Sequence, residues 1–200
     1  MKVYTYFEQI DELKAGTKPK ELVEYWVSHW KAKGWEPVVL TIEDAKKHPY
    51  FPEFFQAIKK VKTTNPFEYE AACFLRHLAM SVVGGGLMTD TDVFNLTLQP
   101  ADLPDPDRML VLGGLVPCAV YGSSAGYEFL CKAMAPYCAK LSSDMHIIAH
   151  LRVPSWQWCP EYPDASGKMI HFPVSKAGLK KLGLIKKFFA ERAVPSVVPA

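Results

Sequence analysis

Two aspartates near the middle of the chain have the spacing of a metal site. Asp90 and Asp92 follow a run of three glycines, Gly84–Gly86, and a short apolar segment that we expect to be a strand. In an extended chain, residues two positions apart project from the same face, so both carboxylates can approach one cation. Oxygen ligands suit Mn²⁺ or Mg²⁺, which keep coordination positions for the phosphate oxygens of a substrate. The motif therefore predicts a divalent metal site that receives a diphosphate, although a solvated turn can have the same sequence.

Composition and length describe an ordinary globular chain. Its 200 residues are 49% hydrophobic and 22% charged, with a formal net charge of +2. We expect one domain and no nucleic-acid partner, because the basic residues are scattered except near the end of the chain. No apolar run reaches the roughly 20 residues of a membrane span, and no signal-peptide core is present, so we expect a cytoplasmic protein. The five cysteines form no Cys-x-x-Cys pair, so they indicate neither a disulfide framework nor a zinc site.

Apolar periodicity predicts strands that alternate with helices. Asn65 and Pro66 favour the start of a long helix that leads to the glycines, because Asn caps free amides and Pro suits a first turn. Strands that alternate with helices predict an α/β fold, with a mainly parallel sheet covered on both sides. The expected strands are 3–7, 36–41, 109–112, 116–121 and 169–172, and the expected helices are 19–34, 42–47, 52–62, 65–83, 127–137, 142–150 and 175–192.

The middle of the chain resembles the sugar-binding region of GT-A fold glycosyltransferases that carry the Asp-x-Asp motif. The resemblance rests on residues 65–78 and 84–93, in which a helix bearing Arg76 leads to glycines, a short strand and the aspartates. Residues 115–134 look like the strand, small-residue turn and helix beside the family's reaction centre, and 169–172 look like its late metal-binding histidine. Cys73 departs from the acidic residue that many relatives have three positions before the arginine. The absence of an anchor suits a bacterial or large DNA virus enzyme, such as the capsid-glycosylating transferases of algal viruses.

The resemblance implies a fold and an activity. It implies one GT-A type domain over 1–200, Rossmann-like and mixed, with a nucleotide-binding half at about 1–98, an acceptor-side half at 99–194 and a tail at 195–200. It implies a metal-dependent hexosyl or deoxyhexosyl transferase that uses a nucleotide sugar, with a UDP-sugar favoured, and a glycan or glycoprotein acceptor. A retaining mechanism is favoured. In this interpretation Asp92 ligates the metal, Asp90 reaches the metal or the donor, and His171 completes the metal site, although a lone histidine can also be structural.

Further residues are candidates for the donor side of such a site. Thr5 and Tyr6 end the first strand, where ligands of open α/β sheets bind, and Tyr6 could stack on uracil or pack in the core. Arg76 is either a phosphate or carboxylate clamp or the partner of a nearby aspartate. Lys176, near a helix start, could hold a phosphate, and otherwise is a solvated lysine.

The acceptor side and the rival functions depend on other residues. Asp144 and Glu128 are candidates for acceptor activation or sugar recognition, although acidic residues on helices are usually solvated. Residues 156–158 contain two tryptophans that could form a platform for a sugar ring or pack inside. With Tyr162, they also support a non-catalytic carbohydrate-binding module as a different class of function.

A second rival is a haloacid dehalogenase-type phosphatase, because residues Asp90–Val93 match the nucleophile motif of that class. That class has its motif after the first strand and adds a late pair of acids, whereas this motif lies nearly halfway along the chain. The basic C-terminal helix, with Lys180, Lys181, Lys186 and Lys187, is expected to present a solvated face.

Overall fold

The core of the molecule is a five-stranded mixed sheet. The computed structural model describes residues 1–10, 19–107, 109–114, 116–173 and 181–193. The strand order is β2-β1-β3-β6-β5. β1 pairs in parallel with β2 and β3, and β6 pairs antiparallel with β3 and β5, so all strands except β6 run in one direction. The strands are β1 (Lys2–Tyr6), β2 (Glu36–Leu40), β3 (Gly85–Thr89), β5 (Leu110–Val111) and β6 (Ala119–Ser123).

A small second sheet joins two distant parts of the chain. β4 (Val93–Asn95) pairs antiparallel with β7 (Met169–His171), and Val93 lies opposite His171. Because Val93 directly follows Asp92, this pairing brings the histidine to the aspartates. The predicted mixed α/β sheet flanked by helices is confirmed.

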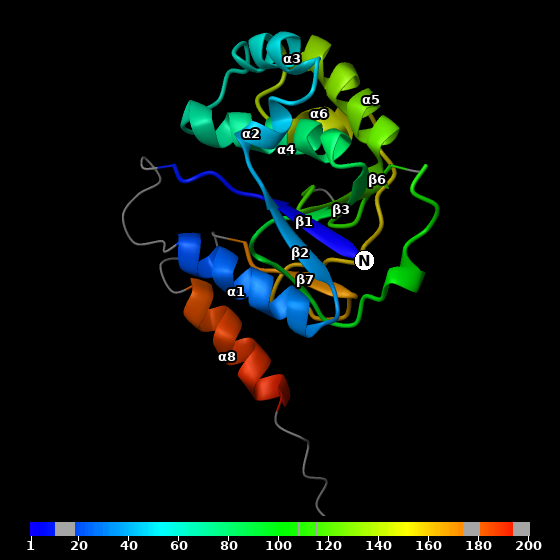
Figure 1. Ribbon diagram of the computed structural model, residues 1–200. Helices are drawn as coiled ribbons and strands as arrows, with labels where there is room; N and C mark the ends of the chain where they lie inside the picture. The colour runs from blue at the N-terminus through cyan, green and yellow to red at the C-terminus, as the bar shows by residue number, and fades with distance from the viewer. Residues whose placement is uncertain (11–18, 108, 115, 174–180, 194–200) are drawn as a thin grey trace, which may run out of the picture.

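Helices cover both faces of the main sheet (Figure 1). α2 to α6 lie on one face of the sheet, and α1 and α8 lie side by side on the other. Between these two helices, the Phe189 ring of α8 packs against the His29 ring of α1. Within the described ranges, no helix combines the length and apolarity needed to cross a membrane. The helices are α1 (Pro19–Ala32), α2 (Ile42–Ala45), α3 (Phe51–Ile58), α4 (Phe67–Val82), α5 (Ser124–Met134), α6 (Asp144–His150) and α8 (Lys181–Ala193), with 3₁₀ turns η1 (Pro100–Asp102) and η2 (Ala135–Tyr137).

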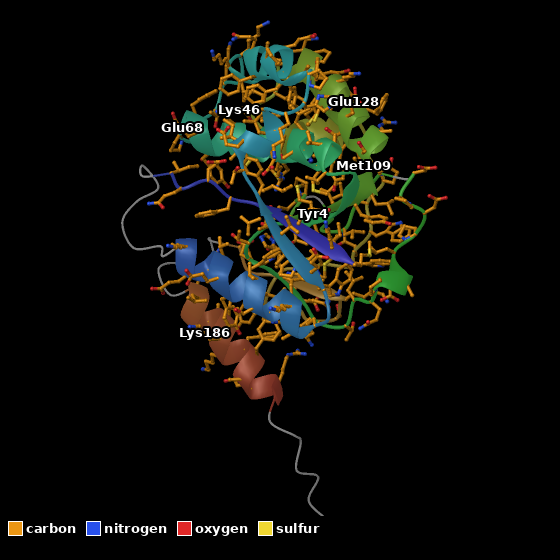
Figure 2. The ribbon with its side chains drawn as sticks, viewed as in Figure 1. Tyr4, Lys46, Glu68, Met109, Glu128 and Lys186 are labelled. Carbon is orange, nitrogen blue, oxygen red and sulfur yellow. The ribbon has the colours of Figure 1, made fainter. Side chains whose placement is uncertain are left out.

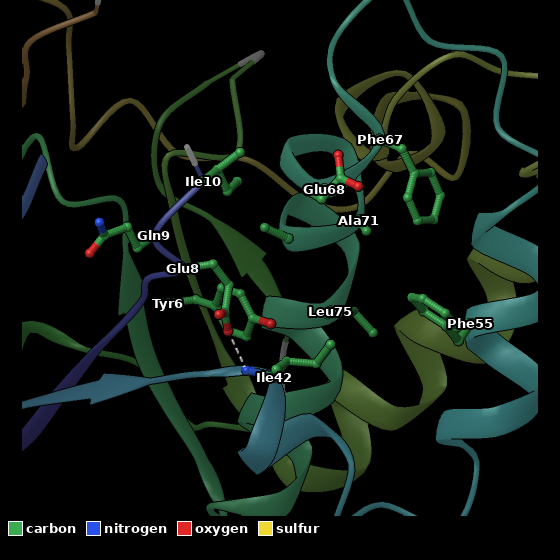
Figure 3. A pocket seen from close by; sticks show the side chains of 11 residues that line it. Tyr6, Glu8, Gln9, Ile10, Ile42, Phe55, Phe67, Glu68, Ala71 and Leu75 are labelled. Atoms are coloured by element: carbon green, nitrogen blue, oxygen red, sulfur yellow. Dashed lines mark hydrogen bonds between the residues drawn. The ribbon is translucent and has the colours of Figure 1, made fainter. Parts of the chain in front are cut away.

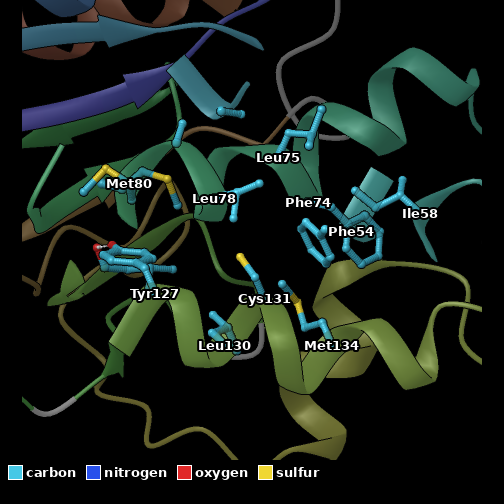
Figure 4. Close-up of a cluster of buried hydrophobic side chains, with 14 of the residues drawn as sticks. Phe54, Ile58, Phe74, Leu75, Leu78, Met80, Tyr127, Leu130, Cys131 and Met134 are labelled. Carbon is cyan, nitrogen blue, oxygen red and sulfur yellow. Dashed lines mark hydrogen bonds between the residues drawn. The ribbon is translucent and has the colours of Figure 1, made fainter. Parts of the chain in front are cut away.

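Strand alternation divides the core between the two faces. Tyr4 and Met88 belong to the cluster that packs under α2 to α6, whereas Val3 and Leu87 belong to the cluster under α1 and α8. Neighbouring residues of a strand point to opposite faces, so an apolar strand buries side chains on both sides. Figure 4 shows the first cluster between α4 and α5. In Figure 2, Tyr4 lies at the sheet, and charged side chains such as Lys46 and Glu128 lie on the outer helices.

Several predicted boundaries are wrong for physical reasons. α4 begins at Phe67 with Pro66 as its N-cap and no side-chain cap, and the side-chain NH₂ of Asn65 instead donates a hydrogen bond of 3.2 Å to the Glu70 carboxylate. The small-residue turn expected after residue 121 is the end of β6, and Ser123 caps α5 by accepting a hydrogen bond from the Gly126 amide. The expected start of the last helix at Ser175 lies outside the described residues.

At Gly85, one of the three glycines, two backbones lie in close contact. Gly85 has φ +80°, and a Cβ built there would lie 2.5 Å from the Gly122 carbonyl oxygen and 2.5 Å from the Ser123 carbonyl carbon. The neighbour that Gly85 approaches is the backbone of β6. A glycine is therefore required at the first residue of β3 for both conformation and space.

Replacement of Gly85 by alanine should destabilise the protein more than the same change at Gly34. Both glycines have φ +80°, so both variants suffer the left-handed strain of about 1–2 kcal/mol, but a Cβ at Gly34 meets nothing within 4 Å. The crowding at Gly85 adds about 1–3 kcal/mol or prevents folding. Urea unfolding of Gly85→Ala and Gly34→Ala measures the difference, and equal stabilities would contradict the close approach of β3 and β6.

Candidate functional site

Asp90, Asp92 and His171 form one cluster at the carboxyl end of β3. One ligand atom from each residue can be chosen so that all lie within 4.8 Å of one another. Ligands of an octahedral Mg²⁺-like ion at about 2.1 Å are about 3.0 Å apart when adjacent and about 4.2 Å apart when opposite. Two carboxylates and an imidazole are also donors that Mn²⁺ accepts. The residues present therefore fit a divalent cation after small side-chain movements.

Two tryptophans of α1 hold the turn that carries the aspartates. Trp26 donates its indole hydrogen bond to the Thr89 hydroxyl at 3.1 Å, and Trp30 donates to the Val93 carbonyl at 3.2 Å. The two indoles are four residues apart on one face of α1, and both are fully buried. They hold the chain on both sides of the Asp90–Asp92 turn. Apolar periodicity predicted the helix at residues 19–34 but not the hydrogen bonds of its tryptophans to the turn.

Arg76 lies between two carboxylates. Its guanidinium forms ion pairs with Asp90 and, at 2.8 Å, with Asp144, and its Nε donates to the Cys73 carbonyl at 3.0 Å. Burial lowers the pKa of Arg76, but the two carboxylates outweigh that effect and raise it. Of the two interpretations of Arg76, the structure favours the partner of a nearby aspartate. Arg76 joins α4, α6 and the end of β3.

Asp144 is a buried anchor and not an open carboxylate. Besides Arg76, it accepts a hydrogen bond of 2.7 Å from the Met145 amide, and His77 Nε2 lies 3.4 Å from it. Burial acts to raise the pKa of Asp144, but Arg76 and His77 lower it. Its side chain is 6% exposed, so an acceptor hydroxyl has little access to it. The predicted role in acceptor activation therefore has no support from these contacts.

Asp90 and Asp92 differ in their electrostatic surroundings. Burial raises the pKa of Asp90 to about 6, with a further contribution from Asp92, against the opposite effect of Arg76. The Asp90 side chain nevertheless remains 35% exposed, so it is open to a ligand. Asp92 is 14% exposed, and His171 and Lys181 lower its pKa against the effect of burial.

The partners of Asp92 come from two distant segments. Its Oδ2 lies 2.5 Å from the Lys181 ammonium, and its Oδ1 lies 3.5 Å from His171 Nε2. Burial would lower the pKa of His171, but Asp92 and the neighbouring Cys118 thiol raise it to about 11. To coordinate a metal, the imidazole must lose this proton.

A pocket of about 460 Å³ opens at the carboxyl end of β1 (Figure 3). Tyr6 and Glu8 line one side of it, and Phe55 and Phe67 line the other. The Glu8 carboxylate accepts a hydrogen bond of 2.5 Å from the Ile42 amide, which ties the chain after β1 to the start of α2. The remaining lining residues are Gln9, Ile10, Ile42, Glu68, Ala71, Ala72 and Leu75.

Polar atoms at the end of β1 are buried without partners. Within the described part of the chain, neither the Thr5 hydroxyl nor the Tyr6 hydroxyl has a hydrogen-bond partner. Burial, with Glu8 nearby, raises the pKa of Tyr6, so the phenol stays neutral. Tyr6 lines the pocket and also packs against the first core cluster, whereas Thr5 is fully buried and does not line the pocket.

Other predicted residues lie away from this site or outside the description. Lys176 lies outside the described residues. Glu128 is paired with Lys132 on the outer side of α5 at 2.6 Å. Trp156 and Trp158 are half-buried and pack against the second core cluster, with ring centroids 4.7 Å apart.

Lys181 was expected on a solvated helix face, but its side chain is only 12% exposed and pairs with Asp92. A helical spacing from Lys181 to Ile185 was the signal that could have found it.

Comparison with known proteins adds a family and a fold. The model of a domain of unknown function, DUF8765, matches residues 1–104. The chain belongs to this family. The matched part of the DUF8765 chain contains Arg76, Asp90, Asp92 and the pocket, whereas Asp144, His171 and Lys181 lie beyond it. No curated protein matches the sequence.

One solved structure resembles the DUF8765 chain over most of its length. It is described as a glycosyltransferase involved in the glycosylation of the major capsid of PBCV-1. The TM-score is 0.50 at 12% sequence identity, and the match covers 91% of this chain and 98% of that one. At this identity the likeness establishes a shared fold.

Removal of Arg76 should strongly destabilise the DUF8765 chain. Arg76→Met leaves the buried Asp144 carboxylate without its cation, which costs about 3–5 kcal/mol. A second change, Asp144→Asn, removes the unpaired buried charge, so the double variant should be more stable than Arg76→Met alone. Urea unfolding of the single and double variants tests this coupling. Additive losses would mean that the two side chains do not act as a buried pair.

Proposed function

We propose that this chain is a metal-dependent glycosyltransferase of the GT-A type. It transfers a hexosyl or deoxyhexosyl group from a nucleotide sugar, with a UDP-sugar favoured, to a glycan or glycoprotein acceptor. The observation that carries the proposal is the cluster of Asp90, Asp92 and His171 at the end of β3. The pocket at the end of the neighbouring strand β1 supports it. Open α/β sheets bind their ligands beyond these strand ends.

Asp90, Asp92 and His171 would hold Mn²⁺ or Mg²⁺. When bound, such an ion neutralises the charge that develops on the leaving diphosphate. Arg76 keeps the Asp90 carboxylate oriented toward the cluster, and Asp144 keeps Arg76 in place. We therefore assign Asp144 a positioning role instead of the role of a base.

The pocket would receive the nucleoside of the donor. Its volume lies in the range of small-molecule sites, and its aromatic walls suit a planar base. Ala72 of the pocket wall and Arg76 are four residues apart on α4, so they lie one turn apart on the same face of the helix. The base in the pocket would therefore be followed along α4 by the diphosphate and the sugar near Asp90.

A retaining mechanism is consistent with the contacts of the acidic residues. An inverting transferase requires a carboxylate free to take a proton from the acceptor. Asp92 and Asp144 are each engaged by cationic side chains and are nearly buried. The PBCV-1 enzyme with the shared fold supports the reaction class, and the donor sugar and acceptor are proposed from the reaction class alone.

The phosphatase alternative makes a different use of Asp90. In that class Asp90 would attack phosphorus, but here Arg76 engages its carboxylate. Turnover of a phosphomonoester in place of a nucleotide sugar would favour the phosphatase. Sugar binding that depends on neither metal nor nucleotide would favour a carbohydrate-binding module.

Replacement of Asp92 by asparagine should remove metal-dependent activity while the fold remains. Even indirect partners of a metal change its affinity by 10–100-fold, so loss of a direct ligand should reduce Mn²⁺-dependent UDP-sugar turnover at least about 100-fold. Asp107→Asn, at an exposed position, is the matched control and should behave as the parent protein. Full turnover by the Asp92 variant would show that the cluster does not hold the metal.

Filling the pocket should weaken nucleotide binding without loss of metal binding. In Ala72→Trp the indole takes up space in the pocket that Leu75 and Tyr6 also line, so UDP should bind at least about tenfold more weakly, about 1.4 kcal/mol. Calorimetry with UDP and with MnCl₂ alone separates the two effects. The control Ala139→Trp lies at an exposed position away from the pocket. Unchanged UDP affinity in the Ala72 variant would place the nucleoside elsewhere.

A further inference from the structure

The C-terminal helix delivers a lysine to the candidate metal site. Lys181, Ile185 and Phe188 recur at four- and three-residue intervals and share one face of α8. Ile185 is fully buried, and the Phe188 ring packs on Phe172 with centroids 5.5 Å apart. This apolar face anchors α8, and its first turn points the Lys181 ammonium at Asp92, 2.5 Å from Oδ2.

The other lysines of α8 differ from Lys181. Lys186 and Lys187 are exposed, and Figure 2 shows Lys186 on the outer side of the helix. The Lys187 side chain is 72% exposed and faces Glu191 at 3.8 Å. Only Lys181 among these three is directed into the site, so its position follows from the buried face of α8.

Lys181 and a divalent cation would use the same carboxylate. Two positive centres a few ångströms apart repel each other, and this repulsion is strong where water is scarce. Lys181 and Asp92 are 12% and 14% exposed, so solvent screens them poorly. An ammonium on a flexible four-carbon stem can instead move to another anion nearby.

We propose that Lys181 is an exchangeable internal cation of the donor site. It neutralises Asp92 before metal binds and moves to the donor diphosphate once metal has taken its place. The inference rests on the proposed function, because it requires Asp92 to be a metal ligand and a diphosphate to be the incoming anion. Lys181 then binds substrate, and α8 becomes part of the donor site.

Calorimetry on the full chain tests the exchange with MnCl₂ alone and then with UDP at saturating MnCl₂. Lys181→Met should bind Mn²⁺ at least about tenfold more tightly, because the competing charge is gone, and UDP at least about tenfold more weakly. Lys181→Arg, which retains a cation, should restore both affinities toward the parent values. Lys187→Met is the control on the same helix and should change neither.

The outcomes separate this inference from the proposed function. Unchanged or weaker Mn²⁺ binding by Lys181→Met overturns the exchange, even if the parent protein transfers sugar with Mn²⁺. Unchanged UDP affinity overturns the movement to the diphosphate. Mn²⁺ binding by Lys181→Met but not by the parent, even with UDP present, means that Lys181 keeps the metal out, so the exchange is overturned and the proposed function loses its metal dependence. If neither protein binds Mn²⁺ and UDP binding still needs Lys181, the lysine replaces the metal permanently and the exchange is overturned.

Discussion

The candidate site depends on the neutralisation of acidic side chains that the fold brings together. Asp90, Asp92 and Asp144 come from the end of β3, the following turn and α6. Like charges this close would repel one another without cations between them. Arg76 lies between Asp90 and Asp144, and Lys181 with His171 faces Asp92. The site is thus a local balance of charge that α4, α6, α8 and β7 jointly maintain.

Local sequence patterns predicted the parts of the site that one segment supplies. The helical stripe of residues 67–82 was predictable because its periodicity of 3.6 is a local property, and the short strand before Asp90 was predictable from its own apolar residues. The placement of His171 opposite Val93 depends on a strand pairing between distant segments. The hydrophobic periodicity of one segment does not indicate which distant segment it pairs with. The resemblance to a known family, and not the residue pattern, pointed to this histidine.

The failures of prediction have similar causes. Lys181 looked like a solvated residue, because charge runs on terminal helices usually are, and only the packing of Ile185 and Phe188 turns it inward. Asp144 looked like an accessible acid, because nothing near it in sequence indicated that Arg76 would cover it. The glycine run is visible in the sequence, but sequence alone could not identify the β6 backbone as the neighbour of Gly85.

The family match stops within the chain, before β6. A fragment cut at residue 104 would therefore contain the Asp-x-Asp turn but would leave β3 as an open edge, with unpaired amides and carbonyls ready to join other chains. Such a fragment would lack the strand that Gly85 abuts and the helix that anchors Arg76 through Asp144. We therefore expect residues 1–104 alone to be unstable, and we expect their aggregation to begin at the β3 edge that β6 covers in the full chain.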